Sequence, residues 1–317
     1  MATLRQRRTE DVDDQASALF GWNQHYEQLG CGNFRGSVSE MVMADGVLYR
    51  EHTNRKLWEE FSAPADHLTL VIPLAVEAGS IFAGQSLNRE TLMVLSSQEA
   101  YEVLATGELG MIGLSVRRSV LEGLLDPANL EWLALAERRR GVELAPDDAA
   151  AVRCMLLGVE QQATCRLDFI SEREHELEVL SSALTRVLLH AMSGDRGHHV
   201  SIIPRRVNNR RRIAKRAIDF MRSNLDGDIG VPEICAAAFA SRRTLQYCFE
   251  EFTHTTPQAY LRALRLNEAR RALRMHSDQS ITGLAFKLGF SSCSHFTRHY
   301  KQMFEELPSA TLKQAPI

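Results

Sequence analysis

The sequence lacks the features of a membrane protein and of a secreted, disulfide-bonded protein. No run approaches the roughly 20 uninterrupted apolar residues that a membrane-spanning helix needs, and the first residues are charged and have no apolar signal-peptide core. The six cysteines form no C-x-x-C pair and no Cys/His spacing typical of a metal site. We therefore expect a cytoplasmic protein with reduced thiols, no membrane association and no bound metal.

Catalytic signatures are missing as well. The chain has no P-loop, no G-x-G-x-x-G, no H-E-x-x-H and no G-x-S-x-G. Of its 11 histidines, only His25, His52 and His67 fall in the first third, and none has the H-x-H spacing that a metal-dependent oxygenase would use. These absences favour a protein that is not an enzyme and needs no cofactor.

Charge is unevenly divided along the 317 residues, although the net charge is only −3. Residues 205–317 contain 19 Lys and Arg against 10 Asp and Glu, a balance of +9, which leaves 18 against 30, or −12, for residues 1–204. A basic third attached to an acidic remainder indicates a polyanion partner for one domain only. The length favours about two domains.

What the C-terminal third contains is a pattern that occurs twice, 51 residues apart. Aromatic, serine and proline positions of the first copy recur in the second: Phe239, Ser241, Leu245, Phe249 and Pro257, then Phe290, Ser292, Phe296, Tyr300 and Pro308. The spacing predicts, in each copy, a helix, a tight turn and a second helix that begins at a capping serine. Two helix-turn-helix units are therefore expected, with Ser241 and Ser292 as the caps.

The second helix of each unit has a polar face opposite its apolar residues. That face carries Arg242, Arg243, Gln246 and Tyr247 in the first unit, and Cys293, Ser294, Thr297 and Arg298 in the second. Arginine and glutamine can read guanine and adenine edges in the DNA major groove. The alternative is an ordinary pair of helical hairpins with solvated faces, but the duplication and the local positive charge favour DNA binding.

Residues 210–312 resemble the DNA-binding domain of the AraC/XylS family of bacterial transcription regulators. The matching segments are Ser241-Arg-Arg-Thr-Leu-Gln, Thr256-Pro257-Gln-Ala-Tyr-Leu, Arg265-Leu-Asn-Glu-Ala-Arg and Gly289-Phe-Ser-Ser-Cys-Ser-His-Phe. The chain departs from the family where a glycine usually follows each recognition helix, at His254 and Glu305, and where Leu307 replaces a Ser/Thr. The resemblance implies that Arg243, Gln246 and Tyr247, and in the second unit Cys293, Ser294 and Arg298, face the bases.

A long helix from Pro257 to His276 is expected between the two units, because apolar residues recur there at helical spacing. A rigid linker of this kind would place the two reading helices about one DNA turn apart, roughly 34 Å. The expected partners are double-stranded promoter DNA and RNA polymerase, and the protein would associate with the nucleoid.

Residues 34–120 have strand character, with short apolar or alternating runs separated by turn residues. The family resemblance implies a cupin-like β-barrel or sandwich there. The predicted fold class is α+β, with domain 1–195 (a barrel at about 34–120 and helices at about 115–193), a linker at 196–209 and a double helix-turn-helix domain at 210–317.

Residues 6–54 resemble the N-terminus of ethanolamine-operon regulators within the same family. The matching segments are Gln6-Arg-Arg-Thr-Glu-Asp-Val, Trp22-Asn-Gln-His-Tyr-Glu-Gln-Leu, Phe34-Arg-Gly, Glu40 and Arg50-Glu-His-Thr-Asn. Trp22 and Tyr26 are candidates for an aromatic cage around a small cation. The alternative is that they pack an N-terminal helix onto the barrel.

An apolar seam between residues 170 and 192 is a candidate dimer interface. It consists of Ile170, Leu177, Leu180, Leu184 and Val187, spaced as in a heptad. The same seam would equally suit the face of a helix that packs against the barrel.

The sequence therefore predicts a homodimeric transcription regulator, in family custom an activator, controlled by a small effector such as an amine. The alternative is a global virulence or quorum-sensing regulator without a metabolite ligand, controlled by a protein partner or by its own level.

Overall fold

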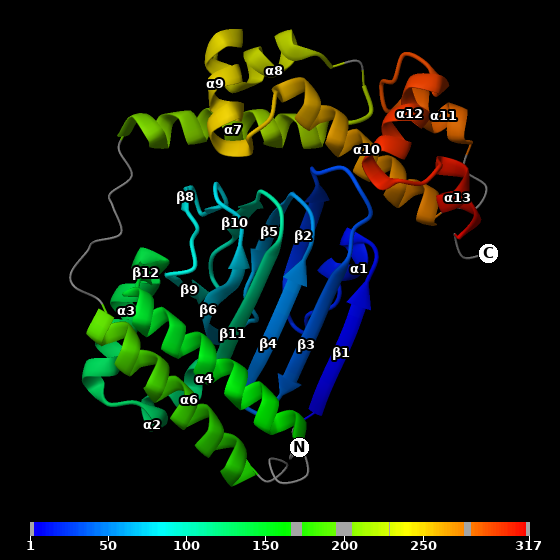
Figure 1. Ribbon diagram of the computed structural model, residues 1–317. Coiled ribbons are helices and arrows are strands. Elements are labelled where there is room, and N and C mark those ends of the chain that lie inside the picture. The colour runs from blue at the N-terminus through cyan, green and yellow to red at the C-terminus, as the bar shows by residue number, and fades with distance from the viewer. Residues whose placement is uncertain (1–2, 166–172, 195–204, 228, 276–279, 315–317) are drawn as a thin grey trace. The chain divides into compact units, whose positions relative to one another are not determined.

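The computed structural model describes residues 3–165, 173–194, 205–227, 229–275 and 280–314 (Figure 1). The chain divides into two compact units. Unit 1 consists of Met1–Tyr26, Arg35–Asn54 and Glu59–Ile202, and unit 2 of Glu27–Phe34, Arg55–Trp58 and Ile203–Ile317. Two short N-terminal segments therefore belong to the same unit as the C-terminal helices. The predicted domains, which are consecutive ranges of the sequence, do not include this exchange.

Unit 1 is built on two β-sheets, and the larger one is antiparallel throughout. The seven-stranded sheet has the order β1 (Thr3–Thr9), β3 (Gly36–Val42), β4 (Gly46–Thr53), β11 (Leu109–Arg117), β6 (His67–Val76), β9 (Thr91–Ser96) and β12 (Gly141–Glu143). The five-stranded sheet has the order β2 (Asn23–Gln28), β5 (Leu57–Ser62), β10 (Tyr101–Ala105), β7 (Ile81–Phe82) and β8 (Gln85–Ser86).

Strand register sorts the residues of the large sheet onto two faces. Glu40 lies opposite Tyr49 and Val38 opposite Glu51 in the β3–β4 pair. Because side chains alternate along a strand, these four residues share one face, while Met41 and Leu48 lie on the other. The second face joins the main hydrophobic core of the unit.

The helices of unit 1 cover that second face (Figure 1). After α1 (Val12–Ala16), which is capped by Asp11, they are α2 (Arg118–Leu124), α3 (Pro127–Arg139), α4 (Pro146–Cys165) and α6 (Arg173–Gly194). Buried residues of α4, such as Val152 and Leu156, meet Leu180 and Leu184 of α6 and the sheet residues in one core.

Two features of the N-terminal part differ from the sequence prediction. The N-terminal helix that one of the two alternatives assigned to Trp22 and Tyr26 is absent there: Tyr26 lies in the strand β2 and Trp22 directly precedes it, and a further strand, β1, begins at Thr3. Polar residues occupy alternate inward positions in β2, so apolar periodicity does not reveal it. The strands of the described residues form two sheets and not a closed barrel.

The seam in α6 packs within the unit. Leu180, Leu184 and Val187 are at most 1% exposed and belong to the core shared with the sheet. They are thus covered inside a single chain, as in the second of the two alternatives, and a dimer interface built on these three side chains is wrong for this structure. Ile170 and the side chain of Leu177 lie outside the described residues.

Unit 2 is helical apart from its two short N-terminal segments. Its helices are α7 (Arg205–Ser223), α8 (Val231–Ala238), α9 (Arg242–Thr253), α10 (Pro257–Met275), α11 (Ile281–Lys287), α12 (Cys293–Phe304) and α13 (Pro308–Lys313). Since α7 begins at Arg205, residues 205–209 of the expected linker are helical; residues 196–204 lie outside the description.

Helix α10 contributes to two separate cores. Tyr260, Leu261 and Leu264 pack with α7, α8 and α9, whereas Leu266 and Leu273 pack with α11 and α12. One rigid helix therefore supports both helix pairs. In the described part of the chain, no helix is long and apolar enough to cross a membrane, and no group of His, Cys, Asp and Glu could hold a metal ion.

Candidate nucleic-acid interface

Helix α9 begins at Ser241, whose side chain accepts a hydrogen bond from the Thr244 backbone N–H at 3.1 Å. This bond satisfies one of the donors left free at a helix start and fixes where the helix begins. Leu245, Cys248 and Phe249 are buried. The opposite face is exposed and presents Arg242, Arg243, Gln246 and Tyr247.

Two of these exposed side chains contact each other. Arg243 Nη2 donates to the Tyr247 hydroxyl at 3.3 Å, and its guanidinium lies 5.6 Å from the centre of the Tyr247 ring. The pair is one helical turn apart, where side chains on a helix surface meet. It holds a planar cationic group on the outside of α9.

Helix α12 repeats this construction. Ser292 accepts from the His295 backbone N–H at 3.2 Å, and Phe296, Tyr300, Met303 and Phe304 are buried. Ser294 and Arg298 are exposed. Cys293 and Thr297 are half-buried, and the Cys293 thiol lies 3.8 Å from Thr282 Oγ1 of α11, so this side of α12 faces its partner helix.

The turns before the two helices are not equivalent at the positions that the sequence repeat aligns. The left-handed residue that ends α8 is Phe239 (φ 52°), whereas the one after α11 is Gly289 (φ 71°). The following backbone N–H bonds are Ala240 to Cys235 and Phe290 to Ala285, a spacing of 50 and not 51 residues. Phe239 is therefore 81% exposed, while Phe290 packs on Phe296.

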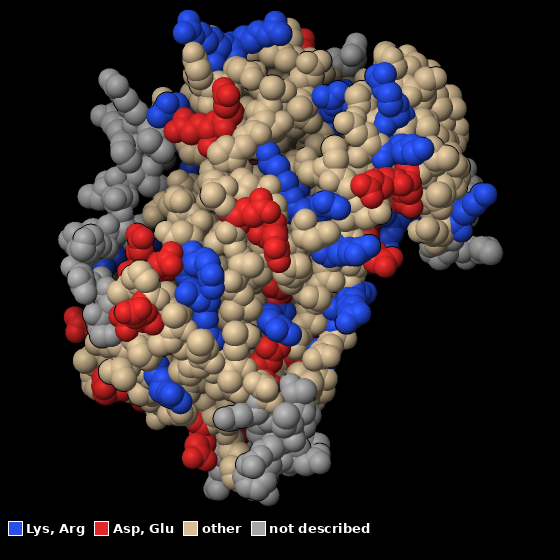
Figure 2. All heavy atoms as spheres, in the orientation of Figure 1, with Lys and Arg blue, Asp and Glu red and all other residues tan. Residues whose placement is uncertain are grey.

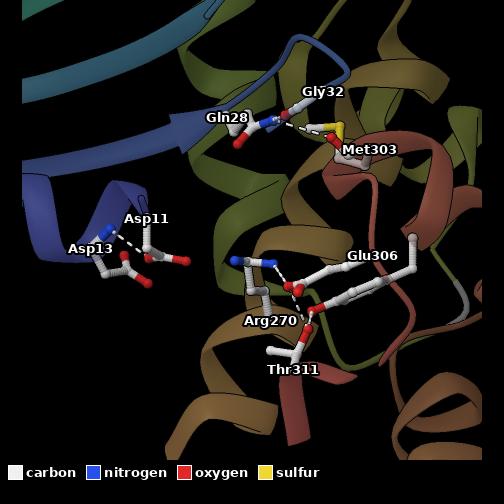
Figure 3. Close-up of polar contacts among 9 residues, drawn as sticks. Asp11, Asp13, Gln28, Gly32, Arg270, Met303, Glu306 and Thr311 are labelled. Carbon is white, nitrogen blue, oxygen red and sulfur yellow. Dashed lines mark hydrogen bonds and ion pairs between the residues drawn. The ribbon is translucent and has the colours of Figure 1, made fainter. Parts of the chain in front are cut away.

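A buried polar network ties α10, α12 and α13 together (Figure 3). Arg270 donates to Glu306, which also accepts from Thr311 Oγ1 at 2.7 Å, and the Thr311 and Tyr300 hydroxyls lie 2.8 Å apart. Burial raises the pKa of Tyr300 to about 12, so the hydroxyl stays protonated. The network fixes the end of α12 on the shared helix.

Three arginines of α10 are bound by groups of unit 2 itself. Arg265 is 9% exposed and donates to the Gly227 carbonyl, and Arg271 pairs with Glu27 at 3.1 Å. Arg270 is bound to Glu306 as described. Their charge therefore serves the packing of the unit.

The segment Glu27–Phe34 of unit 2 is held by hydrogen bonds that no sequence motif indicates. Asn267, 2% exposed on α10, donates to the Gln28 carbonyl at 2.9 Å and accepts from the Gln28 N–H at 3.2 Å. The Gln28 side chain donates to the carbonyls of Gly32 and Met303 at 2.8 and 3.2 Å (Figure 3). Asn267 thus attaches the backbone of Gln28 to helix α10 through two buried hydrogen bonds.

Positive charge is visible on the surface of the helical unit. Figure 2 shows Lys and Arg side chains at the top of the view, with Asp and Glu side chains below them, and the exposed arginines of α9 are Arg242 and Arg243. The surface of α12 adds Arg298 and the exposed Lys301. These charges suit the phosphate backbone of DNA.

In unit 1, the two aromatic residues singled out by the sequence are part of the packing between the sheets. The Trp22 ring lies 5.1 Å from the Tyr49 ring and 5.7 Å from the Phe61 ring. Tyr26 is 1% exposed, and its hydroxyl donates to Glu51 at 2.7 Å. Glu51 and Glu59, which sequence reasoning did not select, are buried carboxyl groups close to the Tyr26 hydroxyl.

Comparison with known proteins agrees with the geometry of unit 2. Residues 234–314 match the family described as "Helix-turn-helix domain". The XylDLEGF operon transcriptional activator of Pseudomonas putida is 35% identical over 102 residues, which cover 32% of each chain. The HTH-type transcriptional regulator GbdR of Pseudomonas aeruginosa is 25% identical over 290 residues, covering 85% of this chain and 76% of that protein.

A solved transcriptional regulator with an AraC-type DNA-binding domain, from Chromobacterium violaceum, is 30% identical over 32% of this chain and 90% of that one, with a TM-score of 0.31. The chain aligns with about a third or less of the length of the first curated relatives. Residues 234–314 thus form a helix-turn-helix domain, and the chain has homologues named as transcriptional activators and regulators.

Proposed function

We propose that this chain is a sequence-specific transcription regulator that binds promoter DNA through two helix-turn-helix units, α8–α9 and α11–α12. The observation that carries the proposal is the construction of α9 and α12. Each begins at a serine cap, buries an aromatic face in the unit and leaves a polar, basic face outside. The match of residues 234–314 to a helix-turn-helix domain supports the same reading.

Helix α10 would set the geometry of DNA reading. It contributes to the cores of both helix pairs, so the pairs would move as one body. Two successive major-groove segments lie about 34 Å apart on one side of the duplex. We propose that α9 reads one segment and α12 the next, and that Arg243, Gln246, Ser294 and Arg298 contact base edges.

We further propose that the protein activates transcription with RNA polymerase, as a cytoplasmic homodimer. Relatives named as transcriptional activators support activation. A dimer would use a surface other than Leu180, Leu184 and Val187, which the core of unit 1 covers. Unit 1 would receive a small effector, and binding would shift the population of DNA-competent arrangements.

The test begins with selection of DNA sequences from a random pool by the full-length protein at fixed salt. On the selected site, Arg243→Ala should weaken binding by about 1–3 kcal/mol and relax sequence preference, because a base contact is lost. Arg138→Ala is the matched control, since Arg138 is an exposed arginine on α3. Failure to enrich any sequence would refute the proposal. Equal losses for both variants would remove Arg243 from the reading face.

A further inference from the structure

Two carboxylates from opposite sheets meet inside unit 1. Glu51 lies on β4 of the seven-stranded sheet and Glu59 on β5 of the five-stranded sheet, and they are 6% and 3% exposed. The side-chain nitrogen of Gln24 lies 3.4 Å from Glu51 Oε2 and 3.1 Å from Glu59 Oε1. A single small group placed between the sheets can therefore reach both carboxylates.

The side chains that hydrogen-bond to these carboxylates are neutral. Glu51 Oε1 accepts from Gln15 Nε2 at 2.6 Å and from the Tyr26 hydroxyl at 2.7 Å. Among the described residues, no Lys or Arg forms an ion pair with Glu51 or Glu59. A buried carboxylate without a cation costs several kcal/mol, and here two lie side by side. Either both stay largely protonated, or a cation from outside supplies the missing charge.

Aromatic rings surround the same place. Tyr49 precedes Glu51 by two residues on β4, and Phe61 follows Glu59 by two on β5, so each ring shares a strand face with a carboxylate. Trp22 and Tyr26 flank Gln24 with the same spacing, and the Trp22 ring contacts the Tyr49 and Phe61 rings. The electron-rich faces of such rings attract organic cations.

Three polar atoms at this place have no hydrogen-bond partner in the part of the chain that the structure describes. They are Trp22 Nε1, Gln24 Oε1 and Thr53 Oγ1, all buried. Thr53 is 2% exposed and lies two residues after Glu51 on the same strand face. Buried polar groups are almost always paired, so three unpaired ones beside two carboxylates mark a place for a polar ligand.

A cavity of about 350 Å³ lies at the β1 edge of the seven-stranded sheet. It is lined by Arg5, Arg7, Phe20, Val38 and Glu40, among others. Val38 is the register partner of Glu51, and Glu40 lies on the same strand face as Val38. The cavity therefore lies on the sheet face that carries Glu51, one strand away, and its lining includes neither Glu51 nor Glu59.

We propose that unit 1 binds a small organic ammonium ion between its sheets, with Glu51 and Glu59 neutralising the charge and Trp22, Tyr49 and Phe61 contacting the alkyl groups. Gln24 and Thr53 orient a polar substituent of the ligand. A regulatory role for this ligand rests on the proposed function, whereas binding of the ligand does not depend on it. The packed rings mean that Trp22 must shift to admit the ligand.

The experiment is calorimetric titration of the full-length protein with choline and with 2-aminoethanol. Each has a neutral counterpart of similar shape, 3,3-dimethylbutan-1-ol and ethylene glycol. At least one ammonium compound should bind at least tenfold more tightly than its neutral counterpart. Glu59→Gln, which keeps the shape and removes the charge, should weaken that binding at least tenfold, as should Glu51→Gln.

Glu122→Gln on α2 is the control, because Glu122 is exposed and outside the sheets. Circular dichroism checks that each variant is folded, and Thr53→Val provides a second, uncharged change at the site. Absence of binding by both ammonium compounds, equal binding of a neutral counterpart, or unchanged binding by Glu59→Gln would overturn the proposal.

DNA binding measured in the same samples separates the two proposals. Ammonium binding that depends on Glu59, without selective DNA binding, would support the site and refute the regulatory function. Selective DNA binding by a protein that ignores both ammonium compounds would do the reverse. Ammonium binding that changes the affinity for the selected DNA would support both.

Discussion

Single residues in left-handed conformation end three of the helices in unit 2. Phe239, His254 and Glu305 have φ values of 52°, 48° and 59°. A side chain with a Cβ costs roughly 1–2 kcal/mol in this conformation, and glycine is the usual residue at such helix ends. The sequence departs at His254 and Glu305 from the family that it resembles, and the backbone nevertheless keeps the left-handed turn that a glycine would make.

Glu305→Gly should therefore stabilise the helical unit. Glu305 is exposed and follows α12, where its N–H donates to the Lys301 carbonyl. Compared with Glu305→Ala, which removes the same charge but keeps the Cβ, the glycine variant should have a free energy of unfolding higher by about 1 kcal/mol. Denaturant unfolding followed by circular dichroism measures the difference. Equal stabilities would mean that the turn is not strained.

Two helices of unit 2 start at a proline but differ in the residue before it. Thr256 Oγ1 accepts from the Ala259 N–H at 3.1 Å and so caps α10. Leu307 precedes Pro308 of α13 and offers no side-chain acceptor, although it is 43% exposed. The start of α10 therefore has a side-chain cap, whereas the start of α13 has none.

Leu307→Ser should add the missing cap. Its hydroxyl can accept from the Ala310 N–H, as the Thr256 hydroxyl does from Ala259, and an added cap is worth about 1 kcal/mol. Leu307→Ala removes the same apolar side chain without adding an oxygen, and serves as the reference. In the other direction, Thr256→Ala should lower the midpoint of thermal unfolding. A serine variant no more stable than the alanine variant would show that α13 is held by Thr311 and its network alone.

At the level of elements, the predictable part of the fold is the helical third. Leu245 and Phe249, and Phe296 and Tyr300, are spaced by four residues, and this period leads directly to the buried faces of α9 and α12. Strand β2 could not be found in this way, because its inward positions are Gln24, Tyr26 and Gln28, chosen for hydrogen bonding and not for burial of apolar area. A strand whose inward side chains are polar shows no alternation of apolar and polar residues in the sequence, so it cannot be found from hydrophobic periodicity.

Some residues of the candidate sites could be predicted from the sequence and others could not. Exposed positions on α9 follow from helical spacing, so Arg243 and Gln246 could be named from the sequence. Glu51 and Glu59 could not, since alternation in a strand is equally consistent with a solvated face and only the pairing of two sheets buries them. Phe239 was aligned with Phe290 by residue type, whereas backbone geometry aligns it with Gly289.

The whole molecule combines an acidic unit that buries carboxylates with a basic unit that exposes arginines. This contrast makes the two units respond to different conditions. Binding of the basic unit to DNA should weaken as salt rises, because each phosphate contact releases counterions. Stability of the acidic unit should instead depend on pH, through the buried carboxylates.

The pH dependence follows from the direction of the pKa shifts. Burial raises the pKa of Glu59 well above its ordinary value of 4.5, and the nearby Glu51 raises it further. Burial also raises the pKa of Glu51, against the hydrogen bonds from Gln15, Tyr26 and Gln24. A group of this kind binds protons more tightly in the folded state. Its contribution to stability is complete below 4.5 and is lost as pH rises through the folded pKa.

The contribution of Glu51 and Glu59 to the free energy of unfolding of the wild-type protein should therefore fall as pH increases from about 4.5 towards neutrality. Glu59→Gln cannot ionise, so its stability should fall less over the same range, and its advantage over wild type should be largest at the highest pH. Denaturant unfolding at a series of pH values measures both slopes, with Glu122→Gln as the exposed reference. Parallel slopes for Glu59→Gln and wild type would contradict a buried, proton-binding Glu59. A saturating ammonium ligand should reduce the wild-type slope, because it stabilises the ionised carboxylates.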